Sequence, residues 1–289
     1  MSKTIHQRAM LVSLKISAWS AKKYDKKISQ EVAAKHSASV DMGRYTKRLL
    51  PQDAKTYAAL NVALGELRAT HYEQTLAWSD EGWRVLPTAN YTTYTSMVRQ
   101  KKGQIESLLS DFIADYPALR AQAEALLNGM FKPEDYPEPM DLQKRYSVKV
   151  DFNPLPAGQD FRIDLDSASL DEIARDTEER VNRAVEQAQA DAVERLHTCV
   201  SRIAERLNDP DAIFRDSLIE NARELTGVLT RLNVTDDPRL EELRQRVEQL
   251  AQVSPEALRT LPFQRATTAK EADAILADMM AVFGEVQHV

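Results

Sequence analysis

The sequence predicts an α+β, predominantly α-helical protein: a small antiparallel three-stranded sheet packed on helices, with an elongated C-terminal helical hairpin or bundle. Three short segments alternate apolar and polar residues with the period of a strand. Longer segments between them repeat apolar residues at helical spacing, and helical stripes fill the last part of the chain. With 289 residues and 43% hydrophobic content, the chain is long enough for a sizeable buried core.

The three expected strands are residues 10–18, 146–152 and 160–165. In the first, the even-numbered positions form the more apolar face of a half-buried strand. The segment NPLPAGQ separates the other two, and its turn-forming residues predict a hairpin. We expect the first strand to join that hairpin across a long sequence separation, because a lone two-stranded hairpin is only marginally stable.

Helices are expected between the first two strands, over residues 20–38, 52–78, about 92–114 and 118–127. Their apolar residues recur near the helical period of 3.6. Gly82 and Pro87 interrupt that pattern, so residues 78–91 are expected to form an aromatic-rich loop. Pro117 is expected to start or bend the last of these helices.

A long helix is expected after residue 166, where Ser169 and Glu172 fit a capping box. Apolar and small residues keep a spacing of three to four over about ten turns. This stripe consists of Ile173, Thr177, Val181, Ala184, Ala188, Ala192, Leu196, Val200, Ile203 and Leu207. The segment Asn208–Pro210 ends the helix.

Three further helices are expected near residues 218–232, 240–250 and 269–283. Each shows a single apolar stripe, which suits packing of helices in a hairpin or bundle, or self-association. The sequence therefore predicts an α+β core domain with a basic N-terminal region over residues 1–166. A helical hairpin or bundle is predicted over residues 167–289.

Charge is distributed unevenly along the chain. The first 50 residues carry 11 Lys and Arg against three acids, whereas the other 239 carry 27 against 41. This asymmetry predicts an anionic partner, either nucleic acid or the acidic surface of another copy. The apolar runs are too short for a membrane span, and the first residues lack the apolar stretch of a signal peptide. We therefore expect a cytoplasmic protein without membrane contact. The single cysteine, Cys199, agrees with a reducing compartment.

Several segments resemble one known family when they are taken in order. They are LVSLKISAWSAKK, WSDEGWRVLPTANYTTY, DFIADYPAL, MFKPEDYP and PLPAGQDFRI, spanning roughly residues 10–165. Together they resemble DUF3150, a family of uncharacterised bacteriophage and mobile-element proteins. The resemblance implies a phage or plasmid context, in the host cytoplasm if the protein is phage-encoded, sometimes beside an AAA-type ATPase as a partner. It assigns no catalytic role to any residue.

The candidate binding residues form a basic patch near the N-terminus: Lys22, Lys23, Lys26, Lys27, Arg44, Lys47 and Arg48. If residues 20–38 are helical, the first four lysines share one helix face and repel one another, so a neutralising anion is attractive there. The patch is then a solvated face, a docking surface for protein, or a site for nucleic-acid phosphates.

Candidate interface or stacking aromatics are Trp19, Tyr24, Trp78, Trp83 and Tyr91. Exposed Trp and Tyr side chains either stack on bases or anchor protein interfaces. The alternative is that the aromatics of residues 78–91 hold that loop onto the core of the protein itself.

No catalytic motif, cofactor motif or metal-ligand spacing is recognisable, and the five histidines are scattered. Asp151, Asp160, Asp164 and Asp166 suggest a divalent-metal cluster, but three of them also fit the solvent face of the predicted strand. The leading hypothesis is a non-enzymatic phage or mobile-element accessory protein that self-assembles through its basic N-terminal face and acidic C-terminal helices. The alternatives are a nucleic-acid-binding accessory protein using the lysines at 22–27 and, third, a cryptic metal-dependent enzyme.

Overall fold

The computed structural model describes residues 4–78, 82–157, 166–209, 212 and 215–284. The chain divides into two compact units. Unit 1 comprises Met1–Ser13, His71–Thr95 and Asp151–Val289, and unit 2 comprises Leu14–Thr70 and Ser96–Val150. Each unit thus combines segments that are distant in sequence. The expected domain division at residue 166 stays a prediction.

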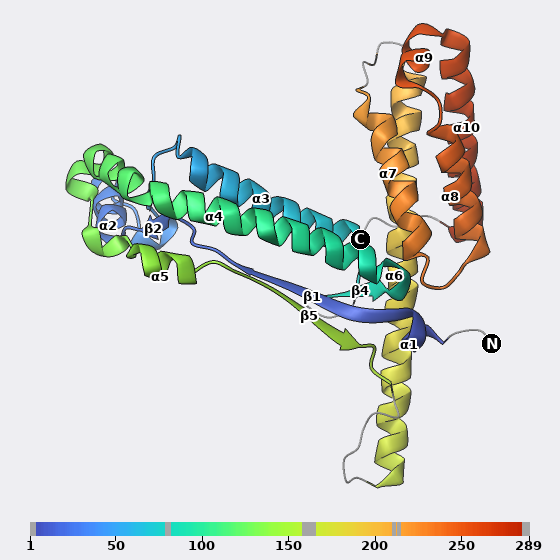
Figure 1. The fold of residues 1–289 in the computed structure, drawn as a ribbon, viewed down its shortest axis with the longest axis horizontal. Helices are drawn as coiled ribbons and strands as arrows, with labels where there is room; N and C mark the ends of the chain where they lie inside the picture. Colours follow the sequence, from blue (N-terminus) through green and yellow to red (C-terminus); the bar gives the residue numbers. More distant parts are fainter. Residues whose placement is uncertain (1–3, 79–81, 158–165, 210–211, 213–214, 285–289) are drawn as a thin grey trace. The chain divides into compact units, whose positions relative to one another are not determined.

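The predicted fold class is confirmed: the protein is mostly helical, with a small three-stranded antiparallel sheet packed against long helices (Figure 1). The sheet order is β4-β1-β5. Its strands are β1 (Ala9–Ser17), β4 (Trp83–Pro87) and β5 (Ser147–Pro154). Strand β1 pairs with β4 in a register that aligns Ala9 with Pro87 and Ser13 with Trp83.

Strand β4 corrects the prediction that residues 78–91 form a loop. Gly82 adopts φ +78°, a left-handed conformation that favours glycine, just before the strand begins. Leu76 and Val85 then exchange two backbone hydrogen bonds of 2.9 Å. The strand is short and its partner β1 lies about 70 residues away, so local alternation does not reveal it. The strand predicted over residues 160–165 lies outside the described residues.

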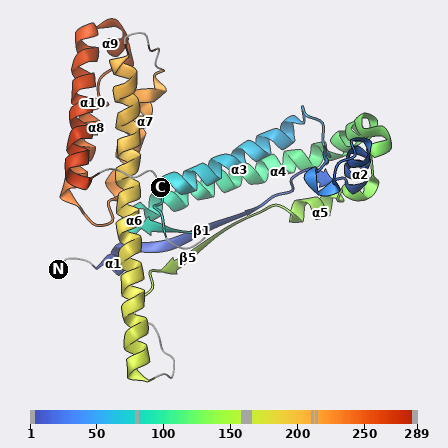
Figure 2. The ribbon, with the colours of Figure 1, turned by 180° about the vertical axis from the view of Figure 1, so that it is seen from behind.

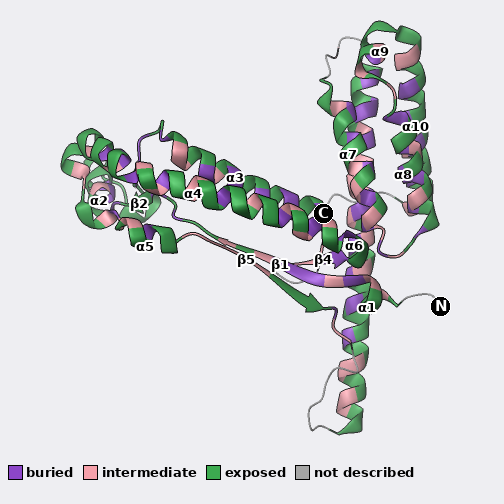
Figure 3. Cartoon of the chain, viewed as in Figure 1, coloured by how far each residue is buried: buried purple, intermediate pink, exposed green. Residues whose placement is uncertain are grey.

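Four helices of unit 1 lie side by side as an antiparallel bundle in both ribbon views (Figure 1, Figure 2). They are α6 (Ser167–Asn208), α7 (Ser217–Leu232), α8 (Pro238–Leu250) and α10 (Pro262–Phe283), and the short helices α1 (Ile5–Arg8) and α9 (Pro255–Thr260) belong to the same unit. Every residue of the predicted α6 stripe except Ile173 is buried, and Figure 3 shows buried positions recurring along α6. The C-terminal helical bundle is therefore confirmed.

The N-cap of α6 is Asp166, not Ser169 as the capping-box pattern predicted. The Asp166 carboxylate accepts hydrogen bonds from the Ser169 backbone N–H at 3.0 Å and from its hydroxyl at 2.7 Å. These bonds hold the pKa of Asp166 below its usual value, the Ser169 side chain contributing most. Asp166 was one of the carboxylates in the candidate metal cluster, and capping accounts for its position.

Unit 2 holds a two-stranded antiparallel sheet and parts of two long helices. Its elements are β2 (Lys22–Tyr24), α2 (Lys26–Lys35), β3 (Thr46–Arg48) and α5 (Pro139–Lys144), together with most of α3 (Lys55–Glu73) and α4 (Tyr91–Leu127). Short 3₁₀ turns occur in unit 2 at Val40–Met42, Asn128–Met130 and Pro133–Asp135, and in unit 1 at Thr88–Asn90. Within unit 2, α3 and α4 run antiparallel, with the Thr56 hydroxyl donating to Asp115 at 2.8 Å and Lys101 lying 3.2 Å from Glu66.

Helix α4 continues through Pro117, so this proline does not start a separate helix. The alternative prediction, that Pro117 bends the helix, stays a prediction. A proline inside a helix costs about 3 kcal/mol, because it removes one backbone hydrogen bond and crowds the preceding turn. Phe112, Tyr116 and Leu119 flank Pro117 and are almost fully buried. Burial of each such side chain contributes about 2 kcal/mol, so packing offsets the cost of the proline.

Candidate functional site

The basic patch is built on a two-stranded sheet and a helix N-terminus in unit 2. Strand β2 pairs with β3, aligning Lys22 with Arg48 and Lys23 with Lys47. Asp25 then caps α2, since its carboxylate accepts the Ile28 backbone N–H at 3.2 Å. The first turn of α2 therefore begins with Lys26 and carries no acidic residue. The predicted single helix over residues 20–38 is wrong, because the chain forms β2 before Asp25 starts the helix.

A pocket of about 460 Å³ lies at this two-stranded sheet and the start of α2. It is lined by Lys23, Tyr24, Asp25, Lys26, Lys27, Gln30, Lys47, Lys132 and Asp135. We call it the lysine pocket. Its five lysines and two aspartates give it a formal charge of +3. Lys132 and Asp135 come from a segment about 100 residues further along the chain, and the sequence offers no local signal that joins them to the basic patch.

Lys47 is the buried centre of this site, and its assignment as an exposed patch residue is wrong. Only 3% of it is exposed. Its ammonium group lies 2.8 Å from the Asp135 carboxylate and 3.6 Å from that of Asp25, and it donates to the Met130 carbonyl at 2.7 Å. The Ile28 N–H, and after it Lys47, keep the pKa of Asp25 below its usual value. Lys47 thus neutralises acids of its own unit and is not available to a partner.

The other six residues of the basic patch are exposed: Lys22, Lys23, Lys26, Lys27, Arg44 and Arg48. They do not share one helix face, because Lys22 and Lys23 lie on β2 while Lys26 and Lys27 open α2. Lys23 lies 3.8 Å from Asp135, and Lys27 forms a solvent-exposed pair with Glu31 at the same distance. Such exposed ion pairs contribute little to stability and hold their side chains only weakly, so most of the positive charge of the patch stays open to solvent.

The predicted aromatics divide into core and surface residues. Trp19 is 7% exposed and packs edge-to-face on Tyr116, with ring centroids 5.9 Å apart, so it is a core residue and not a stacking surface. Trp78 is also buried, and Trp83 packs partly buried against the same core of unit 1. These two placements match the alternative that the loop aromatics hold their segment onto the core.

Two predicted aromatics remain on the surface. Tyr91 is 42% exposed and contacts Phe152 in unit 1. Tyr24 is 43% exposed beside the lysine pocket, and the Arg44 guanidinium lies 5.9 Å from the centre of its ring. Tyr24 is therefore the predicted aromatic that combines exposure with a cationic surrounding.

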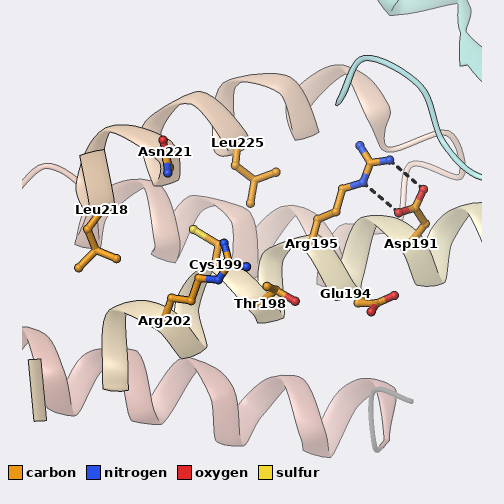
Figure 4. Close-up of a pocket in the computed structure, with 9 residues that line it drawn as sticks. All are labelled: Asp191, Glu194, Arg195, Thr198, Cys199, Arg202, Leu218, Asn221 and Leu225. Carbon is orange, nitrogen blue, oxygen red and sulfur yellow. Dashed lines mark hydrogen bonds and ion pairs between the residues drawn. The ribbon is translucent and has the colours of Figure 1, made fainter. Parts of the chain in front are cut away.

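A second pocket of about 450 Å³ lies between α6 and α7 in unit 1 (Figure 4). Its lining residues are Asp191, Glu194, Arg195, Thr198, Cys199, Arg202, Leu218, Asn221 and Leu225. Burial raises the pKa of the Cys199 thiol to about 11, which keeps it protonated and weakly nucleophilic near neutral pH. The lining combines the apolar side chains of Leu218 and Leu225 with acidic and basic ones.

A polar network that includes two lining residues of this pocket, Asp191 and Arg195, was not predicted from the sequence. The Asp191 carboxylate accepts two hydrogen bonds from Arg195 at 2.9 Å, drawn in Figure 4, and one from the Ala77 backbone N–H at 2.9 Å. Arg195 also donates to the Thr75 carbonyl at 2.8 Å, and Arg84 donates to the Thr75 hydroxyl at 2.7 Å. These bonds connect α6 to the segment before β4, so their role is structural.

His71 lies close to this network and is also buried. Its Nδ1 is 2.9 Å from the Tyr94 hydroxyl. Burial, and secondarily the positive charge of Arg84, lowers the pKa of His71 to about 4. The imidazole is therefore neutral near pH 7.

Neither a metal centre nor a membrane span emerges from the described part of the chain. Within those residues, no three His, Cys, Asp or Glu side chains gather in an arrangement that holds a metal ion. No described helix combines the length and the apolar character needed to cross a bilayer. Asp160 and Asp164 of the suggested carboxylate cluster lie outside the described residues.

No protein-family model matches the chain, and no curated protein or solved structure matches it either. The resemblance to DUF3150, the phage or mobile-element context and the AAA-type ATPase partner therefore stay predictions from the quoted sequence segments.

Proposed function

We propose that the protein is a non-enzymatic assembly protein whose copies associate through the basic unit 2 of one copy and the acidic unit 1 of the next. The observation that supports this is the division of charge between the compact units. Unit 2 carries 19 Lys and Arg against 13 acids, a formal charge of +6, whereas unit 1 carries 19 against 31, a formal charge of −12. Opposite potentials of this kind steer association and select the orientation of contact.

The two units also differ in the kind of cation they use. Unit 2 holds 13 of the 15 lysines, whereas unit 1 holds 17 of the 23 arginines. In unit 1, many arginines form intramolecular pairs, as when Arg244 binds both Glu241 and Glu248. Arginine suits such bidentate contacts, while the strongly hydrated lysine suits a solvent-exposed charge that meets a partner.

The acidic surface proposed for the contact is the first part of α6. Its exposed carboxylates are Asp171, Glu172, Asp176, Glu178 and Glu179, which we call the acidic segment. The partner surface is formed by the six exposed residues of the basic patch. These are different surfaces of one chain, so the contact is heterologous and builds rings or filaments.

The test is light scattering of the purified protein over a salt series. Assembly is expected at low salt and should weaken as salt rises, because exposed charges are screened. Lys22→Glu/Lys26→Glu lowers the formal charge of the six exposed basic-patch residues from +6 to +2, and Glu172→Lys/Asp176→Lys changes that of the five carboxylates of the acidic segment from −5 to −1. Each of these charge-reversal variants alone should be monomeric, and an equimolar mixture should assemble again, because the glutamates introduced in one variant meet the lysines introduced in the other.

Lys102→Glu/Lys149→Glu is the matched control, since both lysines are exposed in unit 2 but lie outside the basic patch. It should assemble at nearly wild-type salt concentrations. A monodisperse monomer at low salt and high concentration would refute the proposal. So would a mixture of the two reversed variants that stays monomeric.

A further inference from the structure

The lysine pocket, which shares Lys23, Lys26 and Lys27 with the basic patch, also has features that fit a phosphate-bearing polymer. We propose that it binds a single-stranded nucleic acid, with its lysines on the phosphates and Tyr24 stacked on a base. This use of the site goes beyond self-assembly and does not depend on it. The pocket volume of about 460 Å³ is in the range of small-ligand sites, large enough for a nucleotide unit.

The two carboxylates of the pocket pair with its buried lysine, and the exposed lysines around them keep a net positive charge. Asp25 and Asp135 are the pocket's two carboxylates, and both face the buried Lys47. Lys26, Lys27 and Lys132 are exposed around them. Glu31 pairs with Lys27 at an exposed contact of 3.8 Å, which neutralises the lysines only in part. Phosphates along a single strand supply further anions at repeated spacing.

The position of two of these lysines conflicts with local helix preference. Lys26 and Lys27 lie in the first turn of α2, where the helix dipole is positive and acidic residues are favoured. Free backbone N–H groups and lysines at one helix end add to the same positive potential. The Asp25 cap and the exposed Lys27–Glu31 pair offset part of this positive potential, and in this proposal the phosphates of the bound strand offset the rest.

Tyr24 supplies a contact that an acidic protein segment does not require. Its ring lines the pocket, is 43% exposed and is approached by the Arg44 guanidinium. An aromatic face next to cations is the arrangement on which bases stack in sequence-tolerant single-strand binding. The combination of phosphate contacts and a stacking surface therefore favours nucleic acid as the occupant.

The experiment is fluorescence anisotropy with labelled oligo-dT and oligo-U, using protein dilute enough to suppress self-association. Wild-type protein should bind at least one of them at low salt, and comparison of the two separates DNA from RNA. Lys26→Gln/Lys27→Gln should reduce the slope of log affinity against log salt by about 1.4, or about 0.7 for each lost phosphate contact. The control Lys102→Gln/Lys149→Gln removes the same charge outside the pocket and should keep the slope closer to wild type.

Stacking is tested with Tyr24→Leu, which should weaken binding about fivefold or more. Tyr91→Leu is its matched control, because Tyr91 is 42% exposed but lies in unit 1. Poly-glutamate, an anionic polymer without phosphates or bases, should compete poorly. The proposal is overturned by the absence of oligonucleotide binding, by equal effects of pocket and control variants, or by poly-glutamate binding that equals oligonucleotide binding.

The two proposals fail separately. A monomer that binds oligonucleotides through the pocket would remove the assembly proposal alone. A protein that assembles without binding oligonucleotides would remove the pocket proposal alone.

Discussion

Acidification from about pH 7.5 to about pH 5 should destabilise the protein through His71. Its ring is 5% exposed and contacts the rings of Tyr72 and Tyr94. Its pKa falls from 6.5 in the unfolded chain to about 4 in the folded protein, because burial and the Arg84 charge disfavour the imidazolium. Below pH 6.5 the unfolded state therefore binds more protons than the folded state, and stability falls as the pH falls.

The size of the effect follows from the two pKa values. At about pH 7.5 the imidazole is neutral in both states, so the group contributes almost no pH dependence. At about pH 5 the unfolded histidine is largely protonated while the folded one is not, and the free energy of unfolding is lower by about 2 kcal/mol. The loss ends near pH 4, where the folded protein also takes up the proton.

The assay is urea unfolding at a series of pH values, followed by circular dichroism. His71→Gln should remove about 2 kcal/mol of the pH dependence, whatever its effect on stability at pH 7.5. Tyr94→Phe should retain most of it, because the hydrogen bond is lost but the burial remains. His36→Gln is the control, since His36 is exposed at the end of α2. An unchanged pH dependence in His71→Gln would show that this reasoning is wrong.

Lys47→Met should lower the free energy of unfolding by about 3 kcal/mol, because it leaves two carboxylates without their buried cation. Urea midpoints measure this, and Lys144→Met, at an exposed pair, should leave the midpoint nearly unchanged. Asp191→Asn should lower the free energy of unfolding by about 3 kcal/mol in the same assay, since two partly buried arginines lose their counter-charge. A loss near zero would contradict the structural role of the Asp191 network. Cys199 should react with iodoacetamide at about pH 8 roughly a hundredfold more slowly in the native protein than in urea, because its thiol has a pKa of about 11. Equal rates would show that the thiol is not buried.

The long-range periodicity of α6 made its fold predictable from sequence. Ala184, Ala188 and Val200 sit at helical spacing, and all three are buried against neighbouring helices. The stripe is long, so its period stands out above local noise. The cap was less predictable, because Asp166, Ser167 and Ser169 are all residue types that begin helices. Only the backbone conformation decides among them.

The short strands were the least predictable elements. Strand β2 has three residues and β4 has five, too few for an alternation to be distinguished from a loop or a helix. Each exists because its backbone groups pair with a strand elsewhere in the chain. Placing Lys22 and Lys23 on a strand, where a helix was predicted, changed the geometry of the basic patch but left both lysines exposed.

The sequence by itself determined the quantities that depend on composition and on local period: a mostly helical chain, a basic beginning and an acidic remainder. Only the tertiary structure decided which charges are open to a partner. Lys47 looks like its neighbours in sequence, yet Asp25 and Asp135 enclose it, while Lys26 remains in solvent. The physical reason is that burial and ion pairing depend on distances between segments that are far apart along the chain. No local pattern encodes the approach of Asp135 to Lys47.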